Sequence, residues 1–317
     1  MKILHFALLA PGSPQWGLRN ALRSVASEYQ EFDWYRYWAL DQVREMREAF
    51  AVQAATFRPD LTFLQIQTPN LLPGAVLSQI PGFTLSWCGD LRDETPEWAW
   101  KVAPHVSLNC FSNLRDVENL RSKGHPAEFL NIGFTTDVFT PDGEPRPETP
   151  EIVFLGTNYA NRFPCSAQRQ KVVAAMRQRY GDRFAVYGGG WGPSDPFLLE
   201  PEEAAAYRSC KIALDINHYQ TVARFTSDRR FRAMGSGAFV IANWHPGIEE
   251  DFEIGKHLVC FRSPDEIPDL VDHYLDHEDE RKAIAAAGCA HVHANHSWDA
   301  RMKEILNFSS KYRKAAA

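Results

Sequence analysis

Apolar runs alternate with helical patterns along both halves of this 317-residue chain. In the first half, the apolar runs predict strands at Lys2–Leu9, Phe32–Trp38, Leu61–Gln67, Thr84–Trp87, Val106–Phe111 and Glu128–Ile132. The segments between them predict helices at Gln15–Tyr29, Leu40–Phe57, Leu72–Gln79 and Asn113–Lys123. Strands that alternate with helices are typical of parallel βαβ units, so we expect one doubly wound domain here.

The second half repeats this alternation with more continuous apolar strands, which suit a sheet covered on both faces. The predicted strands are Ile152–Leu155, Phe184–Tyr187, Lys211–Ile216, Ala238–Ala242 and His257–Phe261. The predicted helices are Ser166–Tyr180, Glu202–Ser209, Asp228–Ser236, Pro264–His277 and Glu278–Asn295. A last helix, Trp298–Tyr312, follows a Ser297 cap and precedes no strand, so it is free to pack on the first domain.

The segment from Pro141 to Pro150 contains four prolines and four charged residues, which favours an extended connector. We therefore expect a Rossmann-like domain in residues 1–140, a linker in 141–150, a second Rossmann-like domain in 151–296 and a returning helix in 297–317. The predicted fold class is α/β, with two doubly wound domains facing each other across a cleft. Open α/β sheets bind ligands at the carboxyl ends of their strands, near helix N-termini.

Composition and net charge disfavour several classes of protein. A hydrophobic content of 44% with 23% charged residues indicates a globular chain. The net charge of −6 disfavours general nucleic-acid binding, which requires a broad cationic surface. No apolar run approaches the roughly 18 to 20 residues of a membrane span, and the six cysteines stand singly, so we expect a cytoplasmic protein with free thiols.

Two glycine-containing loops follow strands of the second half. Gly156, Thr157 and Asn158, with Arg162 further along, suit a phosphate, although an ordinary βα turn would have the same sequence. Gly188, Gly189 and Trp191 belong to a loop that could admit a ligand and stack a ring, or form a tight turn. That loop lacks the G-x-G-x-x-G spacing of dinucleotide binders.

Four arginines fall in the nine residues from Arg224 to Arg232. Ser227 or Asp228 can cap the helix that follows, and Arg229 and Arg230 beside a helix N-terminus could hold a diphosphate. The alternative is a solvated charged surface. Glu250, after the next strand, could bind ribose or sugar hydroxyls or cap a turn.

The order of these motifs resembles group-1 glycosyltransferases, and in particular their spore-maturation-protein-like branch. The resemblance runs from Ser227 through Gly237 to Gly247–Phe252, and continues at Ser263–Ile267 and at His296–Trp298 with Arg301. Gly89–Asp90 and Asp137–Pro141 resemble the family's pattern in the first half. The resemblance covers nearly the whole chain, weakly in residues 1–80 and well in 205–305.

The resemblance implies a GT-B fold whose second domain binds a nucleoside-diphosphate sugar such as a UDP-sugar, and whose first domain binds the acceptor. It implies hexosyl or pentosyl transfer to an acceptor hydroxyl without a metal or other cofactor. The donor-binding residues would be Gly156, Thr157, Asn158, Arg162, Gly188, Gly189, Trp191, Asn217, Ser227, Arg229, Arg230 and Glu250. Many retaining members have glutamates where this chain has Arg224 and Arg232, which leaves the stereochemical outcome open.

Asp90 is the candidate general base, because it follows a predicted strand of the first half at its carboxyl end. Asp93 and His105 are the second choices, and Asp90 could instead cap a turn. His291 and His293 are two residues apart on a predicted helix, which places them on opposite faces and argues against a shared metal ion. Two alternatives remain: a non-catalytic nucleotide- or sugar-binding protein of the same fold, and a glycosyltransferase acting on a modified DNA base.

Overall fold

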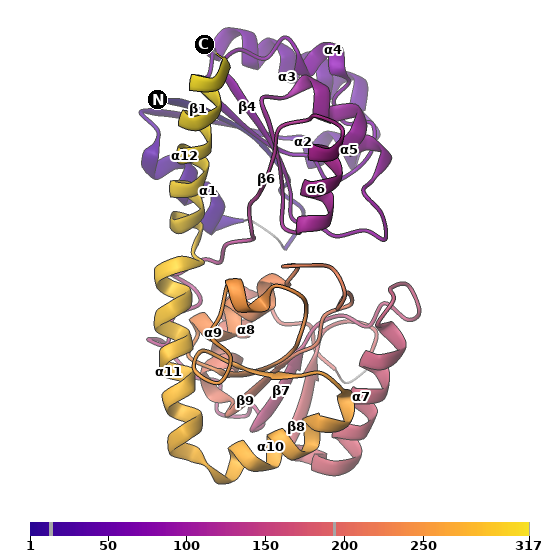
Figure 1. Cartoon of the computed structure of the whole chain (residues 1–317), viewed down its shortest axis with the longest axis vertical. Coiled ribbons are helices and arrows are strands. Elements are labelled where there is room, and N and C mark those ends of the chain that lie inside the picture. Colours follow the sequence, from indigo (N-terminus) through magenta and orange to yellow (C-terminus); the bar gives the residue numbers. More distant parts are fainter. Residues whose placement is uncertain (13–14, 193–194, 317) are drawn as a thin grey trace. The chain divides into compact units, whose positions relative to one another are not determined.

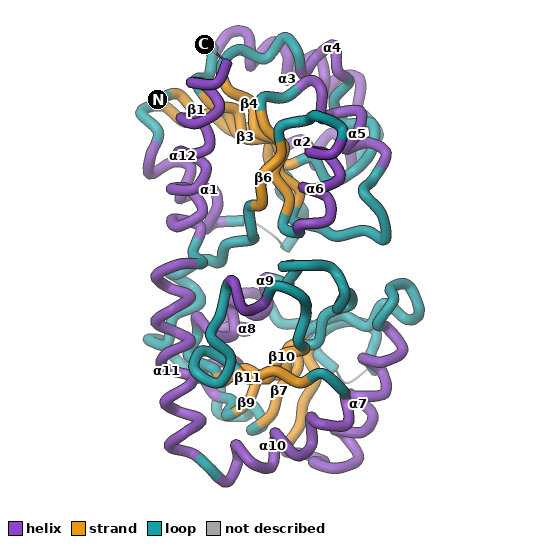
Figure 2. The backbone as a smooth tube through the Cα atoms, in the orientation of Figure 1, coloured by secondary structure: helices purple, strands orange, loops and turns teal. Residues whose placement is uncertain are grey.

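The computed structural model describes residues 1–12, 15–192 and 195–316, which form two compact units (Figure 1). The first unit contains Met1–Ile132 and the segment from Trp298 onwards, and the second is Gly133–Ser297. Each unit is built on one sheet in which all paired strands are parallel (Figure 2). The predicted α/β class with two Rossmann-like sheets is confirmed.

The sheet of the first unit has the strand order β2-β1-β3-β4-β5-β6. Its strands are β1 (Lys2–Ala7), β2 (Glu28–Asp33), β3 (Leu61–Gln65), β4 (Phe83–Cys88), β5 (Leu108–Phe111) and β6 (Ala127–Phe129). Successive side chains of β1 point to opposite faces of the sheet, so Ile3 packs into the core on one face and Leu4 into the core on the other. The helices are α1 (Trp16–Val25), α2 (Trp34–Trp38), α3 (Val43–Phe57), α4 (Gly74–Leu77), α5 (Glu97–Val102), α6 (Leu114–Ser122) and α12 (Trp298–Ala316).

Helix α12 covers one face of this sheet together with α1 (Figure 1). Trp298 meets Trp87 of β4 edge to face, with 5.4 Å between the ring centroids. Met302 and Ile305, one and two turns further on, are buried in the same core as Leu18 of α1. This apolar stripe explains why the last helix of the chain belongs to the first unit.

The sheet of the second unit has the order β11-β10-β9-β7-β8. Its strands are β7 (Ile152–Leu155), β8 (Phe184–Tyr187), β9 (Ile212–Asp215), β10 (Phe239–Asn243) and β11 (Val259–Phe261). The helices are α7 (Ser166–Tyr180), α8 (Glu200–Ser209), α9 (Asp228–Gly235), α10 (Ile267–Asp276) and α11 (Glu278–Asn295). The chain runs outward from β7 to β8 and then returns to β9 on the other side of β7, so the direction of winding reverses between β7 and β9.

The expected strand at Phe32–Trp38 is wrong over most of its length. The strand is Glu28–Asp33, so the preceding helix ends at Val25 and does not reach Tyr29, and Trp34–Trp38 is a helix. Asp33 decides this, because its carboxylate accepts a hydrogen bond from the Tyr35 backbone N–H (3.1 Å) and caps the helix. Aromatic residues favour strands in general, and here the local cap overrides that preference.

The division between the units also differs from the expected linker. It falls at Ile132–Gly133 and again at Ser297–Trp298, whereas Pro141–Pro150 lies within the second unit. The Arg146 backbone N–H donates to Ser209 Oγ (2.6 Å), and Arg208 donates to the carbonyl of Thr140 (3.2 Å). Proline-rich backbone is extended both in a free connector and in a segment fixed to a surface, so composition does not separate the two.

Among the described residues, no helix is long and apolar enough to cross a membrane.

Candidate functional site

The candidate site lies in the second unit at the carboxyl ends of β7 and β9, between which the winding direction reverses. Loop 156–165 connects β7 to α7, and loop 216–227 connects β9 to α9. Both helices therefore begin at this edge of the sheet, with their N-terminal N–H groups directed toward it. Ligands of open α/β sheets bind at such a reversal point.

Gly156 brings two guanidinium groups together directly after β7. A Cβ at this position would lie 2.7 Å from Nη2 of Arg169 and 2.9 Å from Nη1 of Arg229. Arg169 comes from α7 and Arg229 from α9, and both side chains lie over the Phe154 ring, 5.0 and 5.5 Å from its centroid. A side chain at position 156 would therefore displace the two guanidinium groups from this arrangement.

Arg169 carries a buried positive charge that forms no ion pair with any described residue. The residue is 2% exposed, and its Nε and Nη2 have no hydrogen-bond partner within the part of the chain that the structure describes. Burial and the neighbouring Arg229 lower the pKa of Arg169 to about 9, so the side chain remains charged at neutral pH. A buried charge is costly unless it is paired, which makes this guanidinium a strong candidate for binding an anion.

Asp215, the last residue of β9, neutralises only part of this charge. Its two carboxylate oxygens accept from Arg229 Nε (3.3 Å) and Arg230 Nε (2.8 Å). The Arg230 side chain is fully buried, whereas Arg229 keeps 14% of its side chain exposed. We call Arg169, Arg229, Arg230 and Asp215 the basic cluster, in which three cations face one carboxylate.

Neutral hydrogen-bonding groups surround the basic cluster. Both ring nitrogens of His218 are buried without a partner among the described residues, as is Nδ2 of Asn217. Burial, with Arg169 and Arg229 nearby, lowers the pKa of His218 to about 3, so the imidazole is neutral at pH 7. Each of these groups can donate to an anion without adding another charge.

His245, after β10, is locked in one neutral tautomer. Its Nε2 accepts from Arg230 Nη1 (3.0 Å), which leaves the proton on Nδ1, 3.2 Å from the Pro246 carbonyl oxygen. Burial and the adjacent Arg230 lower the pKa of His245 to about 4. In the first unit, burial lowers the pKa of His5, whose Nε2 is 2.8 Å from Gln65 Oε1, to about 4 as well.

We expect acid to destabilise both units through these two histidines. Below pH 6.5 the unfolded chain takes up a proton at each, whereas the folded chain does so only near pH 4. The free energy of unfolding is therefore at its full value above pH 6.5 and falls as the pH drops toward 4, by about 2 kcal/mol per histidine at pH 5. Melting temperatures measured at pH 7.5 and pH 5 check this expectation. His245→Gln should reduce the difference in melting temperature between the two pH values. His277→Gln, which replaces an exposed histidine, should leave that difference unchanged.

The loop after β8 supports the loop after β7. A Cβ at Gly188 would lie 2.7 Å from the Gly156 carbonyl, and the Asn158 backbone N–H donates to the Gly189 carbonyl (2.8 Å). Trp191 Nε1 donates to the Gly156 carbonyl (2.6 Å). These residues, expected from sequence to meet the ligand, hold the backbone beneath the basic cluster, and Thr157 lies in the same supported loop.

The remaining expected donor residues are spread around the site. Arg162 is exposed and stacks on Phe163 (5.4 Å), so it does not join the basic cluster. Ser227 caps α9 by accepting from the Arg229 backbone N–H (3.4 Å), as its position in the sequence indicated. Glu250 is exposed and pairs with Arg224 (3.2 Å).

The four arginines of residues 224–232 do not form one phosphate cradle. Arg224 binds Asp251 through two hydrogen bonds (2.6 and 3.2 Å), and Arg232 pairs with the carboxylates of Glu200, Glu203 and Asp228. These pairs also argue against the alternative of a solvated charged surface. The two arginines at the family's usual glutamate positions therefore have counterions of their own.

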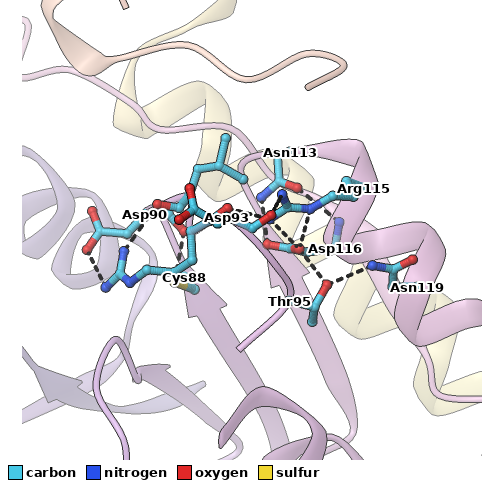
Figure 3. A network of polar contacts seen from close by, with 10 residues as sticks. Cys88, Asp90, Asp93, Thr95, Asn113, Arg115, Asp116 and Asn119 are labelled. Carbon is cyan, nitrogen blue, oxygen red and sulfur yellow. Dashed lines mark hydrogen bonds and ion pairs between the residues drawn. The ribbon is translucent and has the colours of Figure 1, made fainter. Parts of the chain in front are cut away.

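Asp90, the candidate base, lies in the first unit on the loop that follows β4 (Figure 3). Its side chain is half exposed and pairs with Arg92 (3.3 Å), which also donates to the Gln67 carbonyl (3.2 Å). Arg115 fixes this loop by donating to the carbonyls of Asp93 (2.6 Å) and Arg92 (2.7 Å).

Buried Asp116 anchors the same loop. Its carboxylate accepts from Thr95 Oγ1 (2.6 Å), from Asn113 Nδ2 (3.0 Å) and from Arg115 Nε (3.1 Å) (Figure 3). Asn113 in turn caps α6 by accepting from the Asp116 backbone N–H (2.9 Å). The loop that carries Asp90 is thus held to α6 by a closed polar network.

Three residues at the site, Arg169, Asp215 and His218, are not among those expected from the sequence. Arg169 reads as one charged residue of an amphipathic helix, and Asp215 as the end of an apolar strand. The sequence signal that could have identified Asp215 and His218 is their position at the carboxyl end of a predicted strand.

Among the described residues, no group of three or more His, Cys, Asp or Glu side chains could hold a metal ion. His291 and His293 are directed to different carbonyls, those of Asp251 (2.7 Å) and Gly235 (2.9 Å).

Solved structures with the same fold are numerous. HepE of Anabaena in complex with UDP-glucose has a TM-score of 0.68 at 13% identity, covering 98% of this chain and 100% of that one. Sucrose-phosphate synthase from Thermosynechococcus elongatus has a TM-score of 0.66 at 12% identity, covering 99% and 100%. A putative UDP-N-acetylglucosamine 2-epimerase from Listeria monocytogenes has a TM-score of 0.60 at 12% identity, covering 99% and 97%.

No curated protein matches the sequence. Residues 168–307, which include most of α7, all four residues of the basic cluster and the first part of α12, match the family described as Glycosyl transferase-like. The chain therefore has the GT-B fold, and most of its second unit matches the sequence pattern of the glycosyl transferase-like family.

Proposed function

We propose that this protein is a glycosyltransferase that binds a UDP-sugar at the basic cluster and transfers the sugar to an acceptor hydroxyl. The observation that carries the proposal is the buried, unpaired Arg169 guanidinium beside Arg229 over Gly156. A diphosphate supplies the negative charge that this arrangement lacks, and charged hydrogen bonds to guanidinium groups are strong. UDP is chosen because UDP and UDP-glucose occupy HepE, a protein of the same fold.

In this proposal, the acceptor oxygen forms a bond to the anomeric carbon, and the bond from that carbon to the diphosphate oxygen breaks. The nucleoside diphosphate leaves with the electron pair, and Arg229 and Arg169 stabilise its developing charge. The proton of the acceptor hydroxyl passes to the Asp90 carboxylate. Because arginines supply the positive charge opposite the diphosphate, we propose that transfer proceeds without a metal. We also propose that the transferred group is a hexosyl or pentosyl group.

The order of motifs from Ser227 to Arg301 also leads us to place the chain in the spore-maturation-protein-like branch of its superfamily. The two alternative functions are less well supported. A non-catalytic binding protein would not require the polar network that fixes the Asp90 loop. Action on DNA would require a broad cationic surface, whereas the chain carries a net charge of −6.

Nucleotide binding is the first test. UDP at 100 times its dissociation constant is expected to raise the free energy of unfolding by about 2.7 kcal/mol, measured as a thermal shift, with GDP and TDP as comparisons. Mass spectrometry after incubation with UDP-glucose then detects the release of UDP, which accompanies transfer or hydrolysis of the sugar. Epimerisation would leave the mass of the UDP-sugar unchanged. If none of the three nucleotides shifts the melting temperature, the proposed donor site is wrong.

A further inference from the structure

A cavity lies wholly within the first unit. Its volume is about 760 Å³, and it is lined by α3, by the loop after β3, and by α5 with the turn that follows. This volume lies within the range of small-molecule sites, about 300 to 1,000 Å³.

The walls of the cavity combine polar side chains with an apolar side. Leu71, Leu72 and Val102 are buried side chains of the core, and the indole of Trp98 lies beside them. The His105 ring packs so closely on Gly74 that a Cβ there would lie 2.2 Å from His105 Nε2, which closes the wall on that side. Such a surface favours a flat apolar ring in the ligand.

Arg47 brings a positive charge to the cavity. Its guanidinium is held by the carbonyls of Leu71 (2.8 Å) and Asn70, and no carboxylate of the described residues lies within ion-pair distance of it. Glu97 is the one acidic side chain among the lining residues, and it pairs with Lys101 (2.7 Å). A half-buried guanidinium in this position suits an anionic group on the ligand.

The cavity borders the loop that carries Asp90. Thr68 lines the cavity, and the carbonyl of the preceding residue, Gln67, accepts from Arg92, the partner of Asp90. On the other side, Glu97 and Trp98 begin α5 directly after the same loop. The chain segments that form the cavity thus also position the candidate base.

We propose that this cavity binds the acceptor, a small molecule with an aromatic ring, a hydroxyl group and one anionic group that pairs with Arg47. Naming the ligand as the acceptor rests on the proposed function. The hydroxyl gives its proton to Asp90, its oxygen forms the new bond to the anomeric carbon, and the nucleoside diphosphate leaves with the electrons of the broken bond.

Calorimetric titration with para-hydroxybenzoate and para-hydroxybenzamide tests the site, because the two probes differ only in the charged group. The carboxylate is expected to bind at least about tenfold more tightly, consistent with one charged hydrogen-bonded contact. Arg47→Gln should remove this preference. Arg44→Gln, on the same helix at an exposed arginine paired with Glu48, should leave it unchanged.

Equal binding of the two probes, binding of neither, or an unchanged preference in a folded Arg47→Gln variant would overturn the proposal. If Arg47→Gln melts several degrees lower than the native protein, the comparison of the two probes on the native protein decides alone. UDP titration separates this proposal from the preceding one. Para-hydroxybenzoate binding with no affinity for UDP would overturn the proposed function and the acceptor role together, whereas UDP binding without a carboxylate preference would overturn the cavity proposal alone.

Discussion

Replacing Arg169 with methionine is expected to stabilise the ligand-free protein and to weaken UDP binding. The guanidinium is buried and forms no ion pair within the described part of the chain, so an apolar side chain of similar length removes an unpaired charge from the core and should add about 1 to 3 kcal/mol to the free energy of unfolding. The same change removes a charged donor to the diphosphate, which should weaken UDP binding by about ten- to a hundredfold. Denaturant unfolding and calorimetric titration measure the two effects.

Arg179→Met is the matched control, because Arg179 lies on the same helix but is exposed and paired with Asp272. It should change stability by less than about 1 kcal/mol and leave UDP binding intact. Arg169→Lys keeps the charge and should retain part of the affinity. If Arg169→Met lowered stability by several kcal/mol, the side chain would serve packing, and the case for an unpaired anion-binding charge would be lost.

Replacing Asp215 with asparagine is expected to produce the largest loss of stability. Asp215 is buried, and its carboxylate is the only one of the described residues that pairs with Arg229 and Arg230. Its removal leaves three buried or half-buried arginines without any counterion, which should cost about 3 to 5 kcal/mol. For a unit of this size that corresponds to a fall in melting temperature of roughly 6 to 20 °C, measured by thermal unfolding.

Two comparisons separate this effect from a general sensitivity to charge removal. Glu253→Gln breaks an exposed pair with Lys256 in the same unit and should cost less than about 1 kcal/mol. UDP should rescue Asp215→Asn more than it stabilises the native protein, because the diphosphate restores negative charge beside the arginines. A loss no greater than that of Glu253→Gln would show that the basic cluster is not electrostatically strained.

Arg224 and Arg232, at the two positions where the family usually has glutamates, both form ion pairs within the protein. Arg224 is matched by Asp251 and Glu250, and Arg232 by three acidic side chains on α8 and α9. Their charges are satisfied within the protein. Arg169 has no carboxylate partner among the described residues, and Arg229 shares Asp215 with Arg230; Arg169 and Arg229 are the two arginines that lie over Gly156.

The alternation of apolar strands and helices determined the fold class, because each buried parallel strand must be continuous and apolar while each covering helix needs one apolar stripe. The cap at Ser227 was likewise visible, since capping depends on neighbours in sequence. Trp34–Trp38 was missed because a single carboxylate, that of Asp33, outweighed the strand preference of the aromatic residues that follow it.

What only the tertiary structure decided was which charges remain unpaired. The four arginines of residues 224–232 look alike in sequence, yet Arg224 and Arg232 pair with carboxylates of their own, whereas Arg229 and Arg230 share Asp215. The buried cation that pairs with no described carboxylate, Arg169, comes from a helix some 55 residues earlier in the chain. A charge is satisfied or left unsatisfied by groups that the fold brings within a few ångströms. The sequence alone therefore determined the two sheets and the sheet edges at which a ligand is expected. The approach of the Arg169 and Arg229 side chains, from the N-terminal turns of α7 and α9, over Gly156 decided where positive charge is left unmatched.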